Sequence, residues 1–261
     1  MSQLADKWVL ITGASSGFGA ATALGFAKQK SKLLLGARRL DKLQATANAA
    51  LQAGAGEAHV HVLDVSKTAS VETFVAWARE KIGPSAMLDV LINNAGGALG
   101  LDTVATGKDD DWETMLQTNV LGVLRMTRAA LPLMLKNPGS TIINIGSLAG
   151  RVPYEGGAVY CAAKAGERKI TQSLRLELNG TGIRVSSVDP GLAETEFSVV
   201  RFKGDEERAK KVYQGTIPLV ADDVAEAILW VASRPPHVNI DEILIKPTDQ
   251  AAIHKTYRRL K

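Results

Sequence analysis

A short apolar run that passes through a glycine-rich turn into a helix constrains this chain more than any other feature. Trp8-Val-Leu-Ile precedes Thr12-Gly-Ala-Ser-Ser-Gly-Phe-Gly, and an amphipathic stretch follows directly. Glycines at such a junction let the backbone turn tightly and approach a pyrophosphate, while the helix N-terminus offers free N–H donors. An ordinary strand-to-helix turn is the alternative. The context favours a dinucleotide site that uses Gly13, Ser15, Ser16, Gly17, Phe18 and Gly19.

Beyond this turn, apolar runs alternate with amphipathic stretches, which is typical of parallel strands linked by crossover helices. The pattern predicts strands at 8–12, 32–36, 59–63, 88–93, 140–145, 183–188 and 242–245. Helices are expected at 17–30, 41–53, 70–82, 111–136, 154–179 and 221–233. We therefore expect an α/β fold: one doubly wound Rossmann domain over residues 1–261, with a mostly parallel seven-stranded sheet and helices on both faces.

Composition excludes several classes of protein. A chain with 46% hydrophobic and 22% charged residues is expected to fold rather than to be disordered. The single cysteine, Cys161, cannot form an internal disulfide, and His59 and His61 lack a third ligand, so we expect no metal site. No apolar run reaches the roughly 18 residues of a membrane span, and the N-terminus lacks a secretory signal. A cytoplasmic location is the default expectation.

Charge argues against a nucleic-acid partner. The formal net charge is +4, and the charges are interspersed except at the basic C-terminal tail. Nucleic-acid binding would require a larger face of one sign. The tail is expected to be a solvated end; its cations are Lys255, Arg258, Arg259 and Lys261.

The segment 112–135 carries more apolar residues than one buried helix face requires. Two interpretations remain open. The helix is enclosed by the sheet and its neighbours within one chain, or one of its faces contacts a partner subunit.

The end of the second predicted strand indicates which dinucleotide binds. An acidic residue about 20 positions after the glycine motif would bind the ribose of NAD, but this strand ends in Arg38 and Arg39. Arginine binds a 2′-phosphate through charge-assisted hydrogen bonds. The pair favours NADP(H) over NAD(H), with a solvated strand end as the alternative.

A second group of residues supplies chemistry. Ser147 follows a predicted strand, and Tyr160 and Lys164 are four apart on the next helix and so share one face. Ligands of open α/β sheets bind beyond the carboxyl ends of the strands, so the three residues are expected to converge there. A free tyrosine hydroxyl has a pKa near 10, so a base working near neutral pH needs that pKa lowered by about three units, or roughly 4 kcal/mol. A unit positive charge at about 4 Å, such as that of Lys164, supplies on the order of 4 kcal/mol.

Together with several shorter motifs, these residues resemble the short-chain dehydrogenase/reductase family over nearly the whole length of the chain. The motifs that carry the resemblance are TGASSGFG, NNAG at 93–96, Asn119, Ser147, Tyr160-x-x-x-Lys164 and Pro190-Gly191. NNAGGALG, DDWETM, PGLAETEFS, RFKGD and IKPTDQ are similar to the NADP-dependent 3-hydroxy acid dehydrogenases that oxidise serine, allo-threonine and similar substrates.

This resemblance implies roles for four residues. Tyr160 is the acid/base, Ser147 holds the substrate oxygen, Lys164 binds the nicotinamide ribose and assists Tyr160, and Asn119 supports a proton-relay water. It also implies a homotetramer. A broad carbonyl or 3-oxoacyl reductase with the same chemistry is the alternative enzyme, and a noncatalytic NADP(H)-binding sensor is the alternative from another class.

Supporting cofactor contacts follow from the same resemblance. Asp64 and Val65 are similar to the adenine contact, although Asp64 could equally cap a helix. The backbone at Asn93, Ala95 and Gly96 is expected to pass close to the cofactor, with a tight turn as the alternative. Pro190, Gly191 and Thr195 match the nicotinamide-side loop, and Thr195 has a helix cap as its alternative role.

The charged segment at about 193–215 is expected to form a lid over the substrate. Its Arg201 or Lys203 would bind a substrate carboxylate. A solvated loop and helix is the alternative. The expected partners are thus a small hydroxy acid or carbonyl substrate and further copies of the chain, with no membrane and no nucleic acid.

Overall fold

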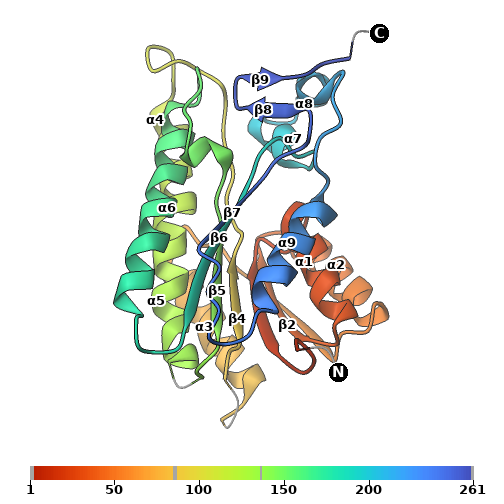
Figure 1. The fold of residues 1–261 in the computed structure, drawn as a ribbon, viewed down its shortest axis with the longest axis vertical. Helices are drawn as coiled ribbons and strands as arrows, with labels where there is room; N and C mark the ends of the chain where they lie inside the picture. Colours follow the sequence, from red (N-terminus) through yellow and green to blue (C-terminus); the bar gives the residue numbers. More distant parts are fainter. Residues whose placement is uncertain (1–2, 85–86, 136, 260–261) are drawn as a thin grey trace.

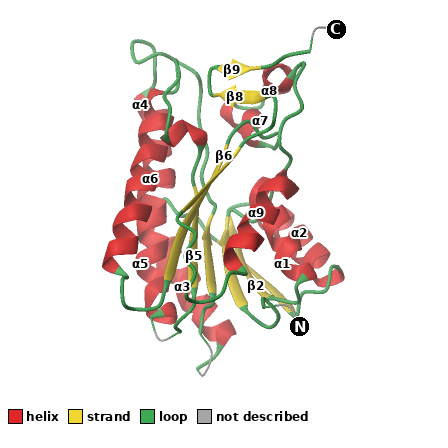
Figure 2. Cartoon of the chain, viewed as in Figure 1, coloured by secondary structure: helices red, strands yellow, loops and turns green. Residues whose placement is uncertain are grey.

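A seven-stranded parallel sheet forms the centre of the protein (Figures 1 and 2). The computed structural model describes residues 3–84, 87–135 and 137–259. The strand order is β3-β2-β1-β4-β5-β6-β7, as expected for a doubly wound sheet. The strands are β1 (Trp8–Thr12), β2 (Lys32–Ala37), β3 (Glu57–Val62), β4 (Val90–Asn93), β5 (Thr141–Ile145), β6 (Arg184–Pro190) and β7 (Glu242–Ile245).

Helices cover both faces of this sheet. On one face lie α1 (Gly17–Lys28), α2 (Leu40–Gln52) and α9 (Ala221–Ala232); on the other lie α3 (Thr68–Ile82), α5 (Gly122–Met134) and α6 (Ala158–Glu177). Central strands are therefore apolar on both sides: Val9, Leu10 and Ile11 of β1 are all fully buried. The expected fold class is confirmed.

Several boundaries differ from the expectations. The sixth strand extends to Pro190, because β7 pairs with it through Ile245. The third strand begins at Glu57 rather than 59, and the fourth begins at Val90 rather than 88. The helix expected from 154 begins at Ala158, since Gly156 has φ +73° and interrupts it. The helix expected to end at Lys30 ends at Lys28, with Lys30 itself at φ +65°.

The long helix expected at 111–136 consists of three consecutive segments. They are α4 (Asp109–Leu116), the π-helical turn η1 (Gln117–Leu121) and α5, which ends at Met134. The expected end, Lys136, lies outside the described residues. A π-turn shifts the helical register and is frequent at functional sites. Here it contains Asn119.

A cap lies over the carboxyl ends of the strands; its helices fall within the segment 193–215 expected to form a lid, whereas its two-stranded hairpin was not expected from the sequence. It contains α7 (Phe197–Arg201), α8 (Glu206–Tyr213) and the antiparallel pair β8 (Gln250–Ala252) and β9 (Lys255–Thr256), which lie together at the top of Figure 1. The basic tail is exposed, as expected, and is also held to the cap, because Arg259 pairs with Asp249 and Arg258 donates to the carbonyl of Gln214. Lys261 lies outside the described residues. None of the helices in the described ranges is long and apolar enough to cross a membrane.

Candidate active site

The glycine turn after β1 packs directly against the loop that follows β4. Gly13 has φ +67°, and a Cβ there would lie 2.9 Å from the Cα of Ala95. A Cβ at Gly19 would lie 2.4 Å from the carbonyl oxygen of Gly13. Larger residues are thus excluded at both positions, and the turn keeps its backbone open toward the crevice.

Asn94 joins these two loops. Its Nδ2 donates to the carbonyl of Thr12 at 2.8 Å, and the Thr12 hydroxyl accepts from the backbone N–H groups of Asn94 and Ala95. The preceding Asn93 instead donates into the protein interior, to Asn144. Of the expected cofactor residues in this loop, Ala95 and Gly96 line the crevice and Asn93 does not.

Arg39 lies beside the glycine turn. Its Nη2 donates to Ser16 Oγ at 2.8 Å and pairs with Glu196 at 2.8 Å. Lys42 also pairs with Glu196, at 2.6 Å. Hydrogen bonds from Lys42 and then Arg39 lower the pKa of Glu196 to about 2. The segment after β6 is therefore tied by charge to the end of β2.

Two expected adenine contacts lie near this cluster. Burial opposes ionisation of Asp64, but hydrogen bonds from Ser66 outweigh it and hold the pKa of Asp64 below its ordinary value; the exposed Arg38 adds a smaller attraction. Ser66 donates to Asp64 through both its N–H and its hydroxyl. Asp64 thus closes a local turn, whereas the residue that caps α3 is Lys67. Val65 is buried and packs near Gly122, and it does not line either of the two pockets at the carboxyl ends of the strands.

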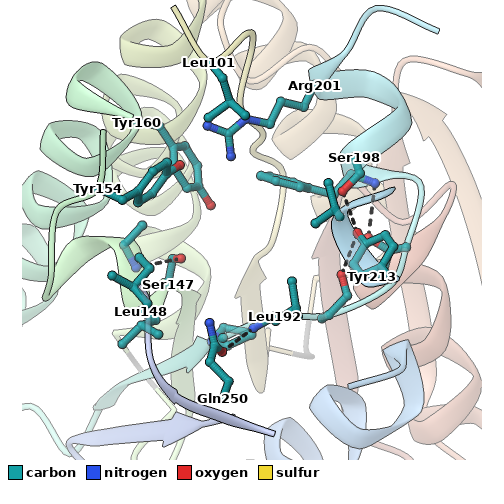
Figure 3. A pocket seen from close by; sticks show the side chains of 18 of the residues that line it. Leu101, Ser147, Leu148, Tyr154, Tyr160, Leu192, Ser198, Arg201, Tyr213 and Gln250 are labelled. Atoms are coloured by element: carbon teal, nitrogen blue, oxygen red, sulfur yellow. Dashed lines mark hydrogen bonds between the residues drawn. The ribbon is translucent and has the colours of Figure 1, made fainter. Parts of the chain in front are cut away.

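Two connected pockets lie at the carboxyl ends of the strands. One, of about 170 Å³, follows the glycine turn and includes Gly13, Ser16, Gly17 and Lys164. The other, of about 400 Å³, lies beneath the cap (Figure 3). The residues that line both pockets are Phe18, Gly146, Tyr160, Thr195 and Phe197.

Tyr160 therefore lies at the junction of the two pockets. Ser147, at the end of β5, faces the larger one, as Figure 3 shows, and its Oγ accepts from the N–H of Ala149 at 3.1 Å. Lys164, one helical turn from Tyr160, faces the smaller one. The structure thus brings together the three residues that the spacing predicted.

Lys164 is held on two sides. Its Nζ donates to the carbonyl of Ile145 and to Glu167 Oε2, both at 2.7 Å. Burial lowers the pKa of the ammonium group, but the carboxylate of Glu167 and then Tyr160 outweigh burial and raise it.

Asn119 lies in the π-turn with its side chain buried. Its Nδ2 donates to the carbonyls of Met115 and Gly97, and its Oδ1 accepts from the N–H of Gly97. A Cβ at Gly96 would lie 2.6 Å from Asn119 Oδ1 and 3.6 Å from Lys164 Nζ. The turn therefore places Asn119 and Lys164 against the same glycine loop.

Arg201 of α7 lies at the far side of the larger pocket. Its Nε donates to the carbonyl of Gly100 at 2.8 Å, and its guanidinium lies 5.3 Å from the ring of Tyr154 and 5.9 Å from that of Tyr160. Lys203, the other cation considered for this position, pairs with Asp111 instead. The structure thus places only Arg201 of these two in the pocket.

Two side chains that the sequence analysis missed also face the pocket. Tyr154 lies beside Arg201, and burial raises the pKa of the Tyr154 hydroxyl to about 12. This hydroxyl makes no hydrogen bond within the described ranges. Gln250 of β8 accepts from the N–H of Leu192 at 2.7 Å. Tyr154 stands in no motif quoted above; Gln250 ends the motif IKPTDQ, but only the folded cap brings it to the site.

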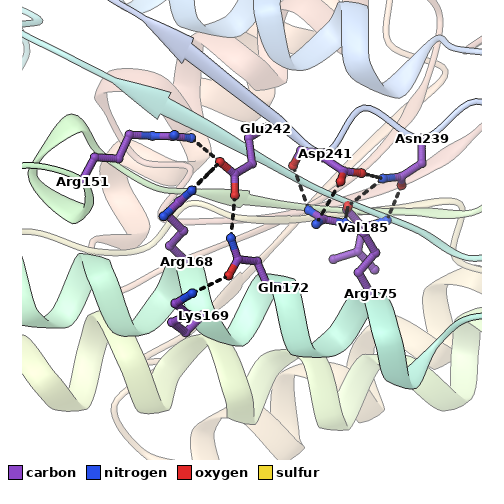
Figure 4. A network of polar contacts seen from close by, with 9 residues as sticks. All are labelled: Arg151, Arg168, Lys169, Gln172, Arg175, Val185, Asn239, Asp241 and Glu242. Carbon is purple, nitrogen blue, oxygen red and sulfur yellow. Dashed lines mark hydrogen bonds and ion pairs between the residues drawn. The ribbon is translucent and has the colours of Figure 1, made fainter.

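A polar network fixes the loops that carry the site. Arg151, just after the turn at Leu148–Gly150, binds Asp189 of β6. Arg151 and Arg168 both bind Glu242 of β7 (Figure 4). Burial opposes ionisation of Glu242, but Arg168, Gln172 and Arg151 together lower its pKa to about 2. The network holds the Ser147 turn against the strand that leads into Pro190.

This geometry has counterparts among known proteins. The short chain dehydrogenase family matches residues 7–206. The chain belongs to that family. It is 44% identical to the NADP-dependent 3-hydroxy acid dehydrogenase of Schizosaccharomyces pombe over an alignment of 260 residues, and the alignment covers 99% of each chain.

Two further relatives are close. Sulfoacetaldehyde reductase of Chromohalobacter salexigens is 42% identical, over 93% of this chain and 94% of the relative. Among solved structures, the closed form of serine dehydrogenase complexed with NADP+ superposes with a TM-score of 0.87 at 41% identity, over 97% of this chain and all of the other. The family expectation from the motifs is confirmed.

Proposed function

We propose that this protein is an NADP(H)-dependent oxidoreductase that interconverts a small 3-hydroxy acid and its carbonyl form. One observation carries the proposal: Tyr160 lies where a cofactor crevice meets a substrate pocket that contains a cation, Arg201. The names of the relatives support the same reaction and the same cofactor.

The crevice residues fit NADP. The glycine turn leaves no room for side chains where a pyrophosphate would approach the backbone, and Ser15 and Ser16 add hydroxyl donors. Arg38 and Arg39 are the cations available for a 2′-phosphate. Pro190, Gly191 and Thr195 would border the nicotinamide. When bound, the cofactor supplies or accepts the hydride.

The chain's own residues handle the proton. In reduction, Tyr160 Oη donates a proton to the developing alkoxide, and the Ser147 hydroxyl donates a hydrogen bond to the same oxygen. In oxidation, the Tyr160 phenolate accepts that proton. Lys164 stabilises the phenolate by its charge and offers a donor to the ribose, and Asn119 shapes the turn beside it.

The larger pocket suits a substrate with an anionic group. Arg201 is held through Nε, which leaves both Nη groups for a carboxylate. The Tyr154 hydroxyl stays protonated at working pH and can donate to the same group. A sulfonate would satisfy these donors too, which fits the sulfoacetaldehyde reductase among the relatives.

We also propose that segment 193–215 acts as a lid within a single domain of residues 1–261. It carries α7 and α8, and Glu196 ties it to Arg39 and Lys42. A homotetramer in the cytoplasm belongs to the same proposal. Exposed apolar side chains support the partner-subunit interpretation of the long helix; they are Leu116, Leu121 and Leu124.

A substrate panel tests the proposal. We expect NADP+ reduction with serine, allo-threonine or 3-hydroxyisobutyrate, and NADPH consumption with the matching carbonyl compounds. Turnover of neutral carbonyls or 3-oxoacyl compounds alone would favour the alternative reductase. NADPH binding without turnover on any of these compounds would favour the noncatalytic sensor and refute the proposal.

A further inference from the structure

A carboxylate that the proposed mechanism does not use lies beside the proposed active-site lysine. Glu167 is 1% exposed and lies three residues after Lys164 on α6, with Oε2 at 2.7 Å from Nζ. Its other oxygen, Oε1, is buried and has no hydrogen-bond partner within the described ranges. Burial of an ionised carboxylate is costly, so its place beside this lysine requires an explanation.

The pair also determines which way the ammonium group faces. Lys164 Nζ has three N–H donors, and the carbonyl of Ile145 and Glu167 Oε2 take two of them. One donor remains for the crevice that Lys164 lines. Tyr160, Lys164 and Glu167 are spaced i, i+4, i+7, so all three share one face of the helix.

We propose that Glu167 is a positioning residue: it holds the ammonium group of Lys164 at the carbonyl of Ile145 and offsets part of the positive charge that reaches Tyr160. The proposal rests on the proposed function, because that function gives Tyr160 and Lys164 their roles. Glu167 also keeps Lys164 protonated at alkaline pH. The carboxylate of Glu167 thereby sets the pH range in which the enzyme works.

Several charged groups face these residues, and Arg201 of α7 lies 5.9 Å from the ring of Tyr160. Tyr160 faces Lys164 from the same helix, and Asp189 faces both residues from β6, with one oxygen bound by Arg151. From β5 and η1 the neighbours are neutral, a carbonyl and Asn119. Burial raises the pKa of Glu167 to about 7, while the attraction of Lys164 favours the ionised carboxylate.

Replacement of this carboxylate should move activity to lower pH. Seven residues separate Glu167 from Tyr160, which is about 10 Å along the helix axis. Removal of one negative charge at that distance corresponds to about one pH unit at an effective dielectric near 20. The alkaline limb of the pH profile of activity should also move to lower pH, because Lys164 loses the partner that keeps it protonated.

The test compares Glu167→Gln with wild type and with Glu177→Gln, an exposed carboxylate on the same helix. The pH profile of kcat/KM for serine oxidation is expected to move down by about one unit in Glu167→Gln alone. A second readout needs no substrate: ultraviolet difference titration of tyrosine ionisation, with Tyr160→Phe as the reference that isolates Tyr160. Its transition should move in the same direction.

The outcomes separate the two proposals. If wild type turns over and neither readout moves in a folded Glu167→Gln protein, the role of Glu167 is refuted, whatever the loss of melting temperature or kcat. If the titration moves but wild type oxidises no hydroxy acid, the proposed function fails and Glu167 keeps its role. Should Glu167→Gln not fold, Glu167→Met, which also removes the charge, takes its place under the same criteria; a pH profile and a titration equal to wild type overturn the proposal.

Discussion

Removal of the Arg201 guanidinium should cost the enzyme its preference for acidic substrates. In Arg201→Met the stem remains and the charge is lost. The guanidinium lies 5.9 Å from the Tyr160 ring, within reach of a carboxylate attached near the reacting carbon. Charge-assisted hydrogen bonds contribute about 1.5–3 kcal/mol, so we expect kcat/KM for serine to fall about 10- to 150-fold.

The assay compares serine with a neutral secondary alcohol in NADP+ reduction. Arg201 also holds the loop at Gly100 and packs on Tyr154, so a purely structural loss would reduce kcat/KM for both substrates. The expected change for the neutral alcohol is less than about threefold. Lys203→Met is the matched control, since Lys203 pairs with Asp111, and it should leave the serine preference intact. Equal losses on serine and on the alcohol in Arg201→Met would refute the reasoning.

Three further predictions concern the cofactor, the proton and stability. Replacement of Arg38 and Arg39 with alanine should raise KM for NADPH at least tenfold more than KM for NADH, because a 2′-phosphate loses its cations; equal changes in steady-state assays would contradict the assignment. Tyr160→Phe should keep NADPH binding in a fluorescence titration and lose at least 100-fold in turnover, and near-normal turnover would exclude Tyr160 as the acid/base. Glu242 has a pKa of about 2 in the fold against 4.5 ordinarily, so its ion pairs stabilise the protein above about pH 4.5 and this contribution is lost as the pH falls toward 2. Glu242→Gln should therefore melt roughly 2–6 °C lower at pH 7, and a gap that does not close in acid, measured by circular dichroism, would count against this explanation.

The parts of the site that depend on local signals could be predicted from the sequence. The strand–turn–helix motif at Gly13 and the four-residue spacing of Tyr160 and Lys164 act within a few residues of chain, and the structure places both as expected. Glu167 obeyed the same helical spacing, i+7 from Tyr160, and the pattern could have indicated it. An acidic residue on a helix is ordinarily solvated, however, so the spacing alone does not predict its burial beside Lys164.

Contacts between distant segments could not be predicted. Arg201 meets the carbonyl of Gly100 across 101 residues of sequence, and Arg151 meets Glu242 across 91. The choice between Arg201 and Lys203 depended on where α7 ends, since Arg201 is its last residue and Lys203 lies in the turn beyond it, and on a partner for Lys203, Asp111, in another element. The docked basic tail has the same cause, since Asp249 is brought to Arg259 only by the hairpin.

The order of apolar and glycine positions alone thus determined the layers of the protein and the place of its cofactor turn, because backbone conformation and side-chain periodicity are properties of neighbouring residues. The tertiary structure decided which cation enters the substrate pocket, which hydroxyl is left free there, and that Lys164 has an anionic partner. Those outcomes depend on burial and on charges that approach one another only when the sheet and its cap are assembled.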